Sequence, residues 1–398
     1  MRRGAWTMLW LVFALAPAPR AAGNEISGYI GMEGRFFAKE GRWAGQKQYN
    51  YSFVAQPQYY HLWTDGSSLT FTPFVRKDSA DHNRSHFDIR ELNYLWLRDE
   101  YEVRVGFSRV FWGATEFVHL ADIINQTDYV ENVDEEDKLG QPMVQLTTAR
   151  EWGTISGFIL PGFRERTYPG TTGRLRLPLP VHTSQAKYES SDGRQHVDMA
   201  IRYSHTLGGL DFGIYHFEGT SREPTLLLRL TRWNLRPFIM PFYEQIKQTG
   251  MDAQWAVGPW LWKLEGYHRV GQGDAFTAAA GGFEYTFRDA LRTGADLGLL
   301  LEYAWDERGN NATTFYQRDL MYGVRVVPND TADSHLLVGI IQDVEDSSQI
   351  LTIEATRRIG DRWRINIEAR GFFNPPDNIV RGTTRDDDYL GVELAYHF

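Results

Sequence analysis

Apolar and polar residues alternate with a period of two along several segments of the chain. Near the C-terminal end, Trp363, Ile365 and Ile367 alternate with Arg364 and the polar residues that follow it. The ranges 26–36 and 49–59 show the same alternation. Because successive side chains of a strand point to opposite faces, these segments predict β-strands with one apolar and one polar face.

Short turn-like segments and longer polar segments alternate between the expected strands. The short turns are expected at 64–67, 98–100, 150–153, 206–209, 257–259, 288–294, 328–333 and 360–362. The longer connections are expected at 39–47, 78–86, 112–141, 162–196, 218–240, 271–276, 307–314, 346–348 and 374–388. This arrangement is typical of an all-β transmembrane antiparallel barrel with short periplasmic turns and long extracellular loops. The count gives about 18 strands, with roughly 16 as the fallback, since such barrels have an even number.

The first 23 residues have the pattern of a secretory signal peptide. Arg2 and Arg3 precede an apolar run over 5–16, and Ala21, Ala22 and Gly23 offer a cleavage site before Asn24. The apolar run is too short to cross a membrane as a helix. We therefore expect residues 1–23 to be a signal peptide and 24–398 to be a barrel in the outer membrane of a Gram-negative bacterium.

Composition narrows the class of protein further. Aromatic residues make up 14% of the chain, and Trp side chains stand beside the expected short turns, where they predict a girdle at the membrane interface. These are Trp63, Trp96, Trp152, Trp255, Trp260 and Trp363. The absence of cysteine excludes disulfides, thiol nucleophiles and Cys-ligated metal sites. A net charge of −9 without a Lys/Arg cluster argues against nucleic acid as a partner.

The end of the chain resembles a known element of bacterial outer-membrane barrels. Leu390, Val392 and Leu394 alternate with small or polar residues, and the last residue is Phe398. This pattern is similar to the closing strand that the barrel-insertion machinery reads. The resemblance implies this machinery, outer-membrane lipid and lipopolysaccharide as partners.

Four further segments resemble a widespread porin-like proteobacterial family of uncharacterised function. They are the runs 91–96 (ELNYLW), 103–113 (VRVGFSRVFWG), 122–129 (DIINQTDY) and 134–137 (DEED). The resemblance implies a barrel fold and a membrane, and it adds no substrate.

Signatures of catalysis or of cofactor binding do not accompany this pattern. The chain contains no G-x-S-x-G, no H-E-x-x-H and no phosphate-binding Gly-Lys pair. Ser204 and His205 are consecutive on one expected strand, so their side chains point to opposite faces and do not form a dyad. We therefore expect no enzymatic activity, no cofactor and no metal.

The alternation assigns charged residues of both signs to the inner wall. If Ile359 pairs with Trp363, then Glu354 faces Glu368, and a diagonal neighbour such as Arg370 must compensate. A barrel of about 18 strands is too wide for side chains alone to fill, which favours a water-filled channel over a salt-bridged core. The expected pore-lining residues are Glu33, Arg35, Arg76, Glu91, Glu102, Arg104, Arg202, Lys263, Glu265, Arg325, Glu354, Arg364, Glu368 and Arg370.

Two of the long connections carry strong charge patterns. The segment 112–141 begins with apolar residues, which need a dry surface, and continues with acids, which need water or cations. We expect it to fold into the lumen as a constriction loop, and a solvated surface loop is the alternative. Its constriction acids are Asp122, Asp128, Glu131, Asp134, Glu135, Glu136 and Asp137. The segment 162–196 carries Arg164, Arg166, Arg174 and Arg176, which would face the acidic loop or bind lipopolysaccharide phosphates.

These observations favour a porin-like channel for the diffusion of small polar solutes. One alternative is a plugged structural or surface-interaction barrel without channel activity. Another is uptake of hydrophobic compounds, which would need a continuous apolar track along the lumen.

Overall fold

The computed structural model describes residues 23–231, 235–314, 316–376 and 381–398. The expected signal peptide therefore lies outside the described residues, apart from Gly23. The strands of the barrel are β1 (Gly23–Phe37), β2 (Tyr49–Leu62), β3 (Ser68–Asp78), β4 (His86–Arg98), β5 (Tyr101–Ser108), β6 (Gln141–Arg150), β7 (Gly153–Pro161), β9 (Val197–Leu207), β10 (Leu210–Thr220), β13 (Gln245–Val257), β14 (Trp260–Gly271), β15 (Gly273–Phe287), β16 (Asp296–Asp306), β17 (Arg318–Val327), β18 (His335–Asp343), β19 (Gln349–Ile359), β20 (Trp363–Phe373) and β21 (Tyr389–His397).

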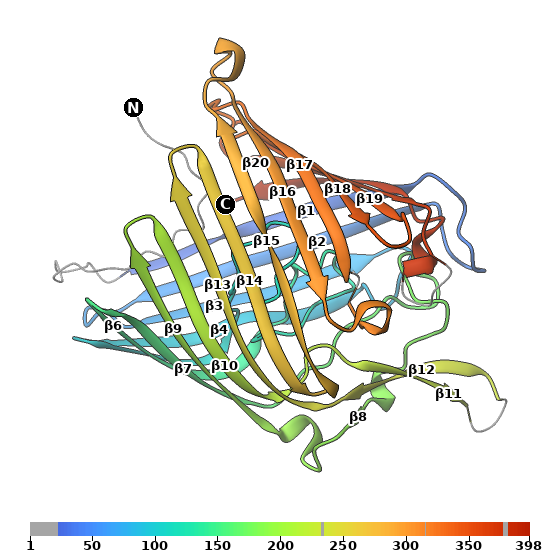
Figure 1. Ribbon diagram of the computed structural model, residues 1–398, viewed down its shortest axis with the longest axis horizontal. Helices are drawn as coiled ribbons and strands as arrows, with labels where there is room; N and C mark the ends of the chain where they lie inside the picture. The colour runs from blue at the N-terminus through green and yellow to red at the C-terminus, as the bar shows by residue number, and fades with distance from the viewer. Residues whose placement is uncertain (1–22, 232–234, 315, 377–380) are drawn as a thin grey trace.

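Each strand of this sheet pairs antiparallel with the barrel strand that follows it in the chain (Figure 1). The last strand, β21, also pairs with β1, with Met32 opposite Leu394, and this pairing closes the sheet into an 18-stranded barrel. The prediction of a closed antiparallel barrel of about 18 strands is confirmed.

The short turns all lie at one end of the barrel and match the predicted positions. They connect β2 to β3, β4 to β5, β6 to β7, β9 to β10, β13 to β14, β15 to β16, β17 to β18 and β19 to β20. The longer connections lie at the other end, and most of them follow the prediction. The connection expected at 271–276 is wrong, because Gln272 alone separates β14 from β15. The connection between β10 and β13 contains a hairpin of β11 (Thr225–Leu230) and β12 (Pro237–Tyr243), which joins the short strand β8 (Lys187–Tyr188) in a second sheet.

Short 3₁₀ turns complete the described secondary structure. They are η1 (Thr183–Gln185), η2 (Gly193–Gln195), η3 (Ala290–Arg292), η4 (Gly309–Asn311) and η5 (Arg381–Thr384). Within the described residues, no helix has the length and apolar character needed to cross a membrane.

The two faces of the barrel wall differ as the alternation predicts. Outward-pointing side chains such as Met32, Ile201 and Leu394 are exposed, whereas inward neighbours such as Arg76 and Tyr215 are buried. The six Trp residues of the predicted girdle are all exposed and lie at or beside the short turns. Because indole favours the interface between lipid and water, this arrangement fits a wall whose apolar face meets lipid.

Candidate functional site: the loop inside the barrel

The connection 109–140, between β5 and β6, folds into the interior of the barrel. Residues 121–131 are all buried. Near the start of the loop, Trp112, Ile123 and Ile124 pack against inward side chains of β6, β7, β9, β10 and β13. Phe117 and Val118 pack against inward side chains of β15 to β18. The apolar part of the loop thus lies against the inner wall, as the sequence predicts.

Two glutamates of the wall hold the first part of this loop through its backbone. Glu265 on β14 accepts hydrogen bonds from the amides of Ala114 (2.6 Å), Thr115 (2.9 Å) and Ala121 (2.8 Å). Glu302 on β16 accepts a bond from the amide of Glu116 at 2.9 Å. A carboxylate that accepts several amide hydrogens makes strong, charge-assisted bonds. Glu265, a predicted pore-lining residue, is fully buried and serves as an anchor for the loop instead.

A third contact with the wall is an ion-pair cluster around Glu116. Its carboxylate lies 3.1 Å from Nζ of Lys263 on β14 and 2.6 Å from Nη2 of Arg325 on β17. Burial alone would raise the pKa of Glu116, but the two cations lower it to about 2. This carboxylate therefore stays ionised at any physiological pH.

The opposite side of the loop is bound to arginines of β1, β3 and β4. Arg76 lies 2.7 Å from Glu131, and Arg90 lies 2.7 Å from Asp128. Arg35 donates a further bond to the main-chain oxygen of Glu131 at 2.8 Å. Asp128 and Glu131 were expected to face the channel, but both are buried against the wall. Their charge is compensated by guanidinium groups and is not presented to the lumen.

A histidine and two carboxylates of this cluster have the residue types of a metal site. The ligand atoms of His86, Asp128 and Glu131 all lie within 4.8 Å of one another. However, Arg90 and Arg76 already bond the two carboxylates, and their positive charges oppose a further cation at this position. The geometry therefore favours an ion-pair network in which the His86 ring bridges the two acids.

Arg90 reaches this network because β4 is irregular. Thr72 of β3 pairs with Glu91, whereas the next residue, Pro73, pairs with Ile89, so Arg90 has no partner in the ladder. Such a bulge lets two consecutive side chains turn toward the same face. Arg90 is 2% exposed and reaches Asp128, although strict alternation would place it on the lipid side.

The second half of the loop lies beside β19 and β20, where Arg370 contacts three carboxylates. It lies 3.0 Å from Asp134 of the loop, 3.2 Å from Glu354 and 3.0 Å from Glu368. Burial raises the pKa of Asp134 well above its usual value, and Arg370 opposes this shift. Arg370 is thus one cation among three acids, and the raised pKa of Asp134 reduces the negative charge that these acids carry.

Two acids in or beside this cluster are open to solvent although they lie inside the barrel. The side chain of Glu136 is 58% exposed and that of Glu354 is 44% exposed. They line one cavity of about 30 Å³ with Glu116, Asp134 and Arg370, between the loop and β18 to β20. A cavity of this size has room for one or two water molecules.

The connection 162–196 covers the inward-folded loop. Arg164 lies 2.7 Å from Asp88 of β4, and Arg166 lies 2.9 Å from Glu135. Arg174 instead contacts Asp387, 2.5 Å away in the connection that precedes β21. The first two arginines thus face the acidic loop or the wall beside it, which is one of the two expected arrangements. Arg176 stacks on Trp43, and Arg174 also donates a hydrogen bond to the main-chain oxygen of Lys39.

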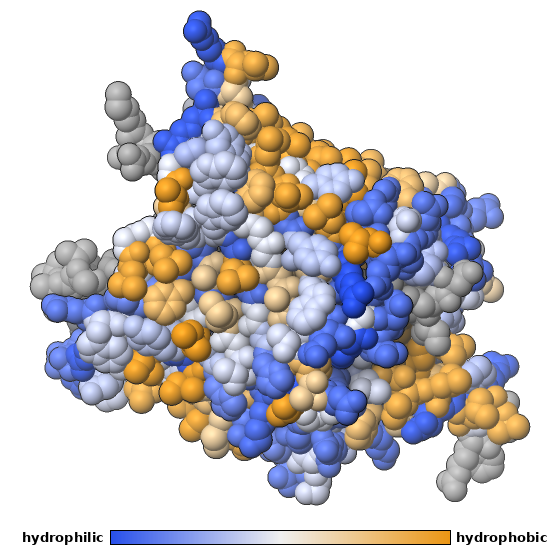
Figure 2. Space-filling model, viewed as in Figure 1, coloured by the Kyte–Doolittle hydropathy of each residue, from blue (hydrophilic) through white to orange (hydrophobic). Residues whose placement is uncertain are grey.

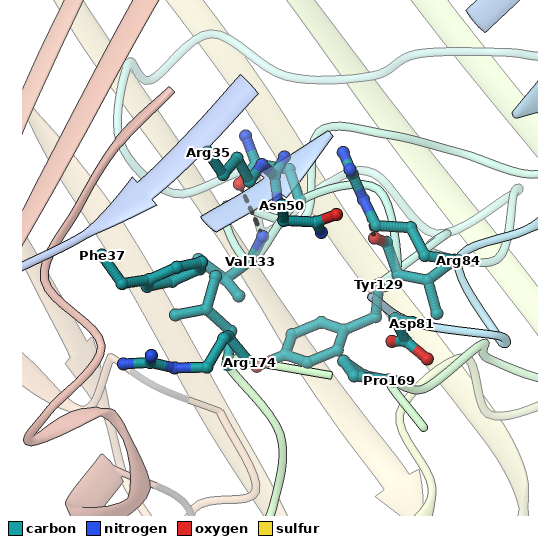
Figure 3. A pocket seen from close by; sticks show the side chains of 12 residues that line it. Arg35, Phe37, Asn50, Asp81, Arg84, Tyr129, Val133, Pro169 and Arg174 are labelled. Carbon is teal, nitrogen blue, oxygen red and sulfur yellow. Dashed lines mark hydrogen bonds between the residues drawn. The ribbon is translucent and has the colours of Figure 1, made fainter. Parts of the chain in front are cut away.

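Figure 3 shows the place where these segments meet the wall. Arg35 and Arg84 come from the side of β1 to β4, Tyr129 from the inward-folded loop, and Pro169 and Arg174 from the covering loop. The space that they enclose is about 20 Å³, enough for one water molecule. The covering loop and the wall therefore clamp the inward-folded loop from two sides.

The remaining predicted residues divide into buried and open groups. Glu33 is bonded to Arg35, Arg76 and Arg84, and Arg202 lies 2.5 Å from Asp252. Open to the interior at the turn end are Glu102 with Arg104, 3.2 Å apart, and Arg364, which lies 3.3 Å from Asp333. Among the loop acids, Asp122 is buried beside Lys138 at 3.2 Å, whereas Asp134, Glu135, Glu136 and Asp137 keep some exposure.

Comparisons with known proteins find that this chain is similar to solved structures of porins. No family model and no curated protein matches the chain. A double mutant of Rh. blastica porin is 11% identical with a TM-score of 0.47, over 94% of this chain and 100% of that one. A triple mutant of Rhodopseudomonas blastica porin is 10% identical with a TM-score of 0.46 over the same shares. Similarity at this level does not assign a function to this chain. Membership of the uncharacterised porin-like family stays a prediction.

Proposed function

We propose that the protein is an outer-membrane channel that passes small polar solutes by diffusion. The observation that carries the proposal is the exposure of Glu136 and Glu354 inside the barrel wall. An ionised side chain within a barrel requires water or a close counterion. Neither acid is fully covered by its ion-pair partner, so both face a hydrated space beside the inward-folded loop.

The loop sets the width of this hydrated space. Glu265 and Glu302 fix its first part, arginines of β1 to β4 fix its middle, and Arg370 holds its second half. With contacts on several sides of the wall, the loop acts as a fixed constriction. Solutes would pass between its residues 132–137 and the wall formed by β17 to β20.

The local charge favours cations at this constriction. Asp134, Glu354 and Glu368 contact Arg370, and Glu136 lines the same cavity, 3.9 Å from His119. A narrow passage with excess negative charge raises the local concentration of cations, and salt screens this effect within about 10 Å at 0.1 M. We therefore expect a moderate preference for cations that weakens as salt increases.

A plugged barrel without channel activity is the second candidate. It is favoured by the uninterrupted burial of residues 121–131, which occupy much of the interior. In that case the hydrated space beside Glu136 would be closed at one end and would not cross the barrel. Uptake of hydrophobic compounds has less support, because apolar side chains of the inner wall such as Phe158 and Phe217 lie against the loop.

Single-channel current in planar bilayers tests the proposal. Purified protein should give stable stepwise conductance with a preference for K⁺ over Cl⁻ in 0.1 M KCl. The double variant Glu136→Gln, Glu354→Gln should reduce the permeability ratio by about twofold, and 1 M salt should abolish the difference. Asp361→Asn, in an exposed turn, is the matched control and should leave the ratio unchanged.

Absence of current from protein that has inserted into the bilayer would favour the plugged barrel. The proposed outer-membrane location is the same for the channel and for the plugged barrel.

We also propose that the C-terminal strand ending at Phe398 is read by the insertion machinery, and that lipopolysaccharide surrounds the wall.

A further inference from the structure

Two glycines face each other on the inner side of the wall. Gly323 of β17 is directly opposite Gly339 of β18. The next inward pair along these strands, Met321 and Ile341, has full side chains that are buried. Glycine inside a strand weakens it and often marks a place where another part of the protein approaches closely. The layer of inward side chains therefore has a gap at Gly323 and Gly339.

The outer side of the same strands carries full side chains. Tyr322 and Val324 flank Gly323 in the chain, point outward and are exposed. Figure 2 shows hydrophobic side chains gathered over this part of the outer wall, where Figure 1 places β16 to β18. The gap is therefore a feature of the inner surface alone.

The ring of Phe117, from the inward-folded loop, occupies this gap. A Cβ atom on Gly339 would lie 2.8 Å from Cε1 and 3.1 Å from Cζ of the ring, and one on Gly323 would lie 3.3 Å from Cζ. Carbon atoms in contact are about 3.5–4.0 Å apart, so a larger residue at 339 would push the ring off the wall. Neither glycine adopts a positive φ, so the space above it, and not the backbone conformation, favours glycine here.

The backbone on either side of this ring is fixed to the wall. The amides of Glu116 and Phe117 both donate to the carboxylate of Glu302 on β16, at 2.9 and 3.3 Å. The side chain of Glu116 is paired with Lys263 of β14 and Arg325 of β17. With the backbone held from three strands, the side chain at 117 fills the space that remains between the loop and β17 to β18.

The same ring borders the hydrated space of the proposed channel. Phe117 lines the cavity of about 30 Å³ together with the exposed acids Glu136 and Glu354. Trp112, another aromatic residue of the loop, instead packs with Phe158 of β7 and Tyr215 of β10, away from this cavity. Phe117 thus stands between the wall and the passage, whereas Trp112 fastens the loop elsewhere.

We propose that Phe117, seated on Gly323 and Gly339, sets the size limit of the channel. This inference rests on the proposed function and names the residue that fixes the width of its passage. The diameter of a pore and the groups that line it decide which solutes pass. An exposed acid such as Glu136 can move aside for a solute, but a ring held between the loop and the wall cannot. The acids therefore set the charge preference and the ring sets the size.

Single-channel conductance and exclusion of polyethylene glycols of increasing mass test the inference. In 1 M KCl, charge effects are screened within about 3 Å, so the conductance reports the width of the passage. Phe117→Ala should raise the conductance by roughly half and admit larger polymers, because a site that loses a ring collapses only partially. Tyr322→Ala removes a ring from the outer face of β17 and is the matched control, which should leave both values unchanged.

The glycine supplies the second half of the test. Gly339→Ala should push the ring into the passage and lower the conductance, opposite in direction to Phe117→Ala. Adding Gly339→Leu to Phe117→Ala should fill the gap from the wall and return the conductance toward that of wild type. Gly157→Leu, on the outer face of β7 where nothing lies within 4 Å of the added Cβ, is the control for a new side chain on a strand.

A change in electrophoretic mobility on heating reports whether each variant is a folded barrel. If Phe117→Ala and Gly339→Ala both raise the conductance, the loop has merely loosened and the inference is overturned. Wild-type current that folded Phe117→Ala leaves unchanged would overturn this inference alone. Absence of current from inserted wild type would overturn the channel and this inference together.

Discussion

Glu354 and Arg370 lie diagonally across the β19–β20 hairpin, with Oε1 and Nη2 3.2 Å apart. Directly across the ladder, Glu354 pairs with Glu368, an acid opposite an acid. Like charges in directly opposed positions destabilise a strand pair unless a neighbour compensates. Arg370 provides that compensation and also reaches Asp134 of the inward-folded loop, so it joins the wall to the constriction.

Arg370→Ala should therefore weaken both the hairpin and the loop. Three carboxylates lose their shared cation, and breaking a buried ion pair costs about 3–5 kcal/mol. We expect the free energy of unfolding in detergent to fall by that amount and the preference for cations to increase. Arg357→Ala removes an exposed ion pair with Asp330 and should cost less than about 1 kcal/mol. Equal effects of the two variants would contradict the assignment.

Glu265→Ala should release the first part of the loop from the wall. Its carboxylate accepts bonds from the amides of Ala114, Thr115 and Ala121, all of which would lose their acceptor. Unsatisfied buried donors cost about 1–3 kcal/mol each, so we expect a loss of at least about 2 kcal/mol. Limited proteolysis should then cut within 109–140. Glu100→Ala, in an exposed turn, serves as the control and should leave the loop resistant.

The register of the wall could be predicted because alternation fixes it. One face of each strand meets lipid, so a slip by one residue would turn every charged side chain outward. Ile359 pairs with Trp363 and Glu354 with Glu368, as the sequence predicts. The short turns followed from the same pattern, since polar and glycine-rich breaks end each strand.

The roles of the charged side chains inside the barrel could be predicted only in part. The mixed character of 112–141 placed the loop inside, but it did not show which acids would turn to the wall. Asp128 and Glu131 turn to the wall because they pair with arginines that are distant in sequence. Arg90 points inward because of a bulge in β4. Two consecutive charged residues, Arg90 and Glu91, interrupt the alternation of β4 and are the signal that would have revealed it.

The orientation of the barrel can be tested with single cysteines, because the chain has none. Ser191 is exposed in the covering loop, and Asp361 is exposed in the turn between β19 and β20. An impermeant maleimide should label Ser191→Cys on intact cells and Asp361→Cys only after the outer membrane is permeabilised. The reverse pattern would invert the proposed topology.

Asp137 should make the constriction sensitive to pH. Burial raises the pKa of Asp137 to about 7, and the neighbouring Glu131 adds to this shift. Arg76 and Arg90 oppose it, and Asp128 reinforces it. His119 stays protonated across neutral pH, because a hydrogen bond to Glu136 and the charge of Glu265 raise its pKa to about 9 despite burial. The carboxyl group of Asp137 therefore gains its charge as the pH rises through 7.

Two measurements can detect this gain of negative charge as the pH rises. Between pH 3.8 and about 7, the folded protein holds a proton that the unfolded chain has lost, so the free energy of unfolding should decrease as the pH rises through this window. Over the upper part of the same window and up to pH 8, the added negative charge should increase the preference for K⁺ in reversal-potential measurements at 0.1 M KCl. Asp137→Asn removes this titrating proton and should reduce both dependences, whereas Asp134, whose pKa is also raised, keeps its own contribution. A variant that keeps the full pH response of wild type would assign the titration to another group of the lumen.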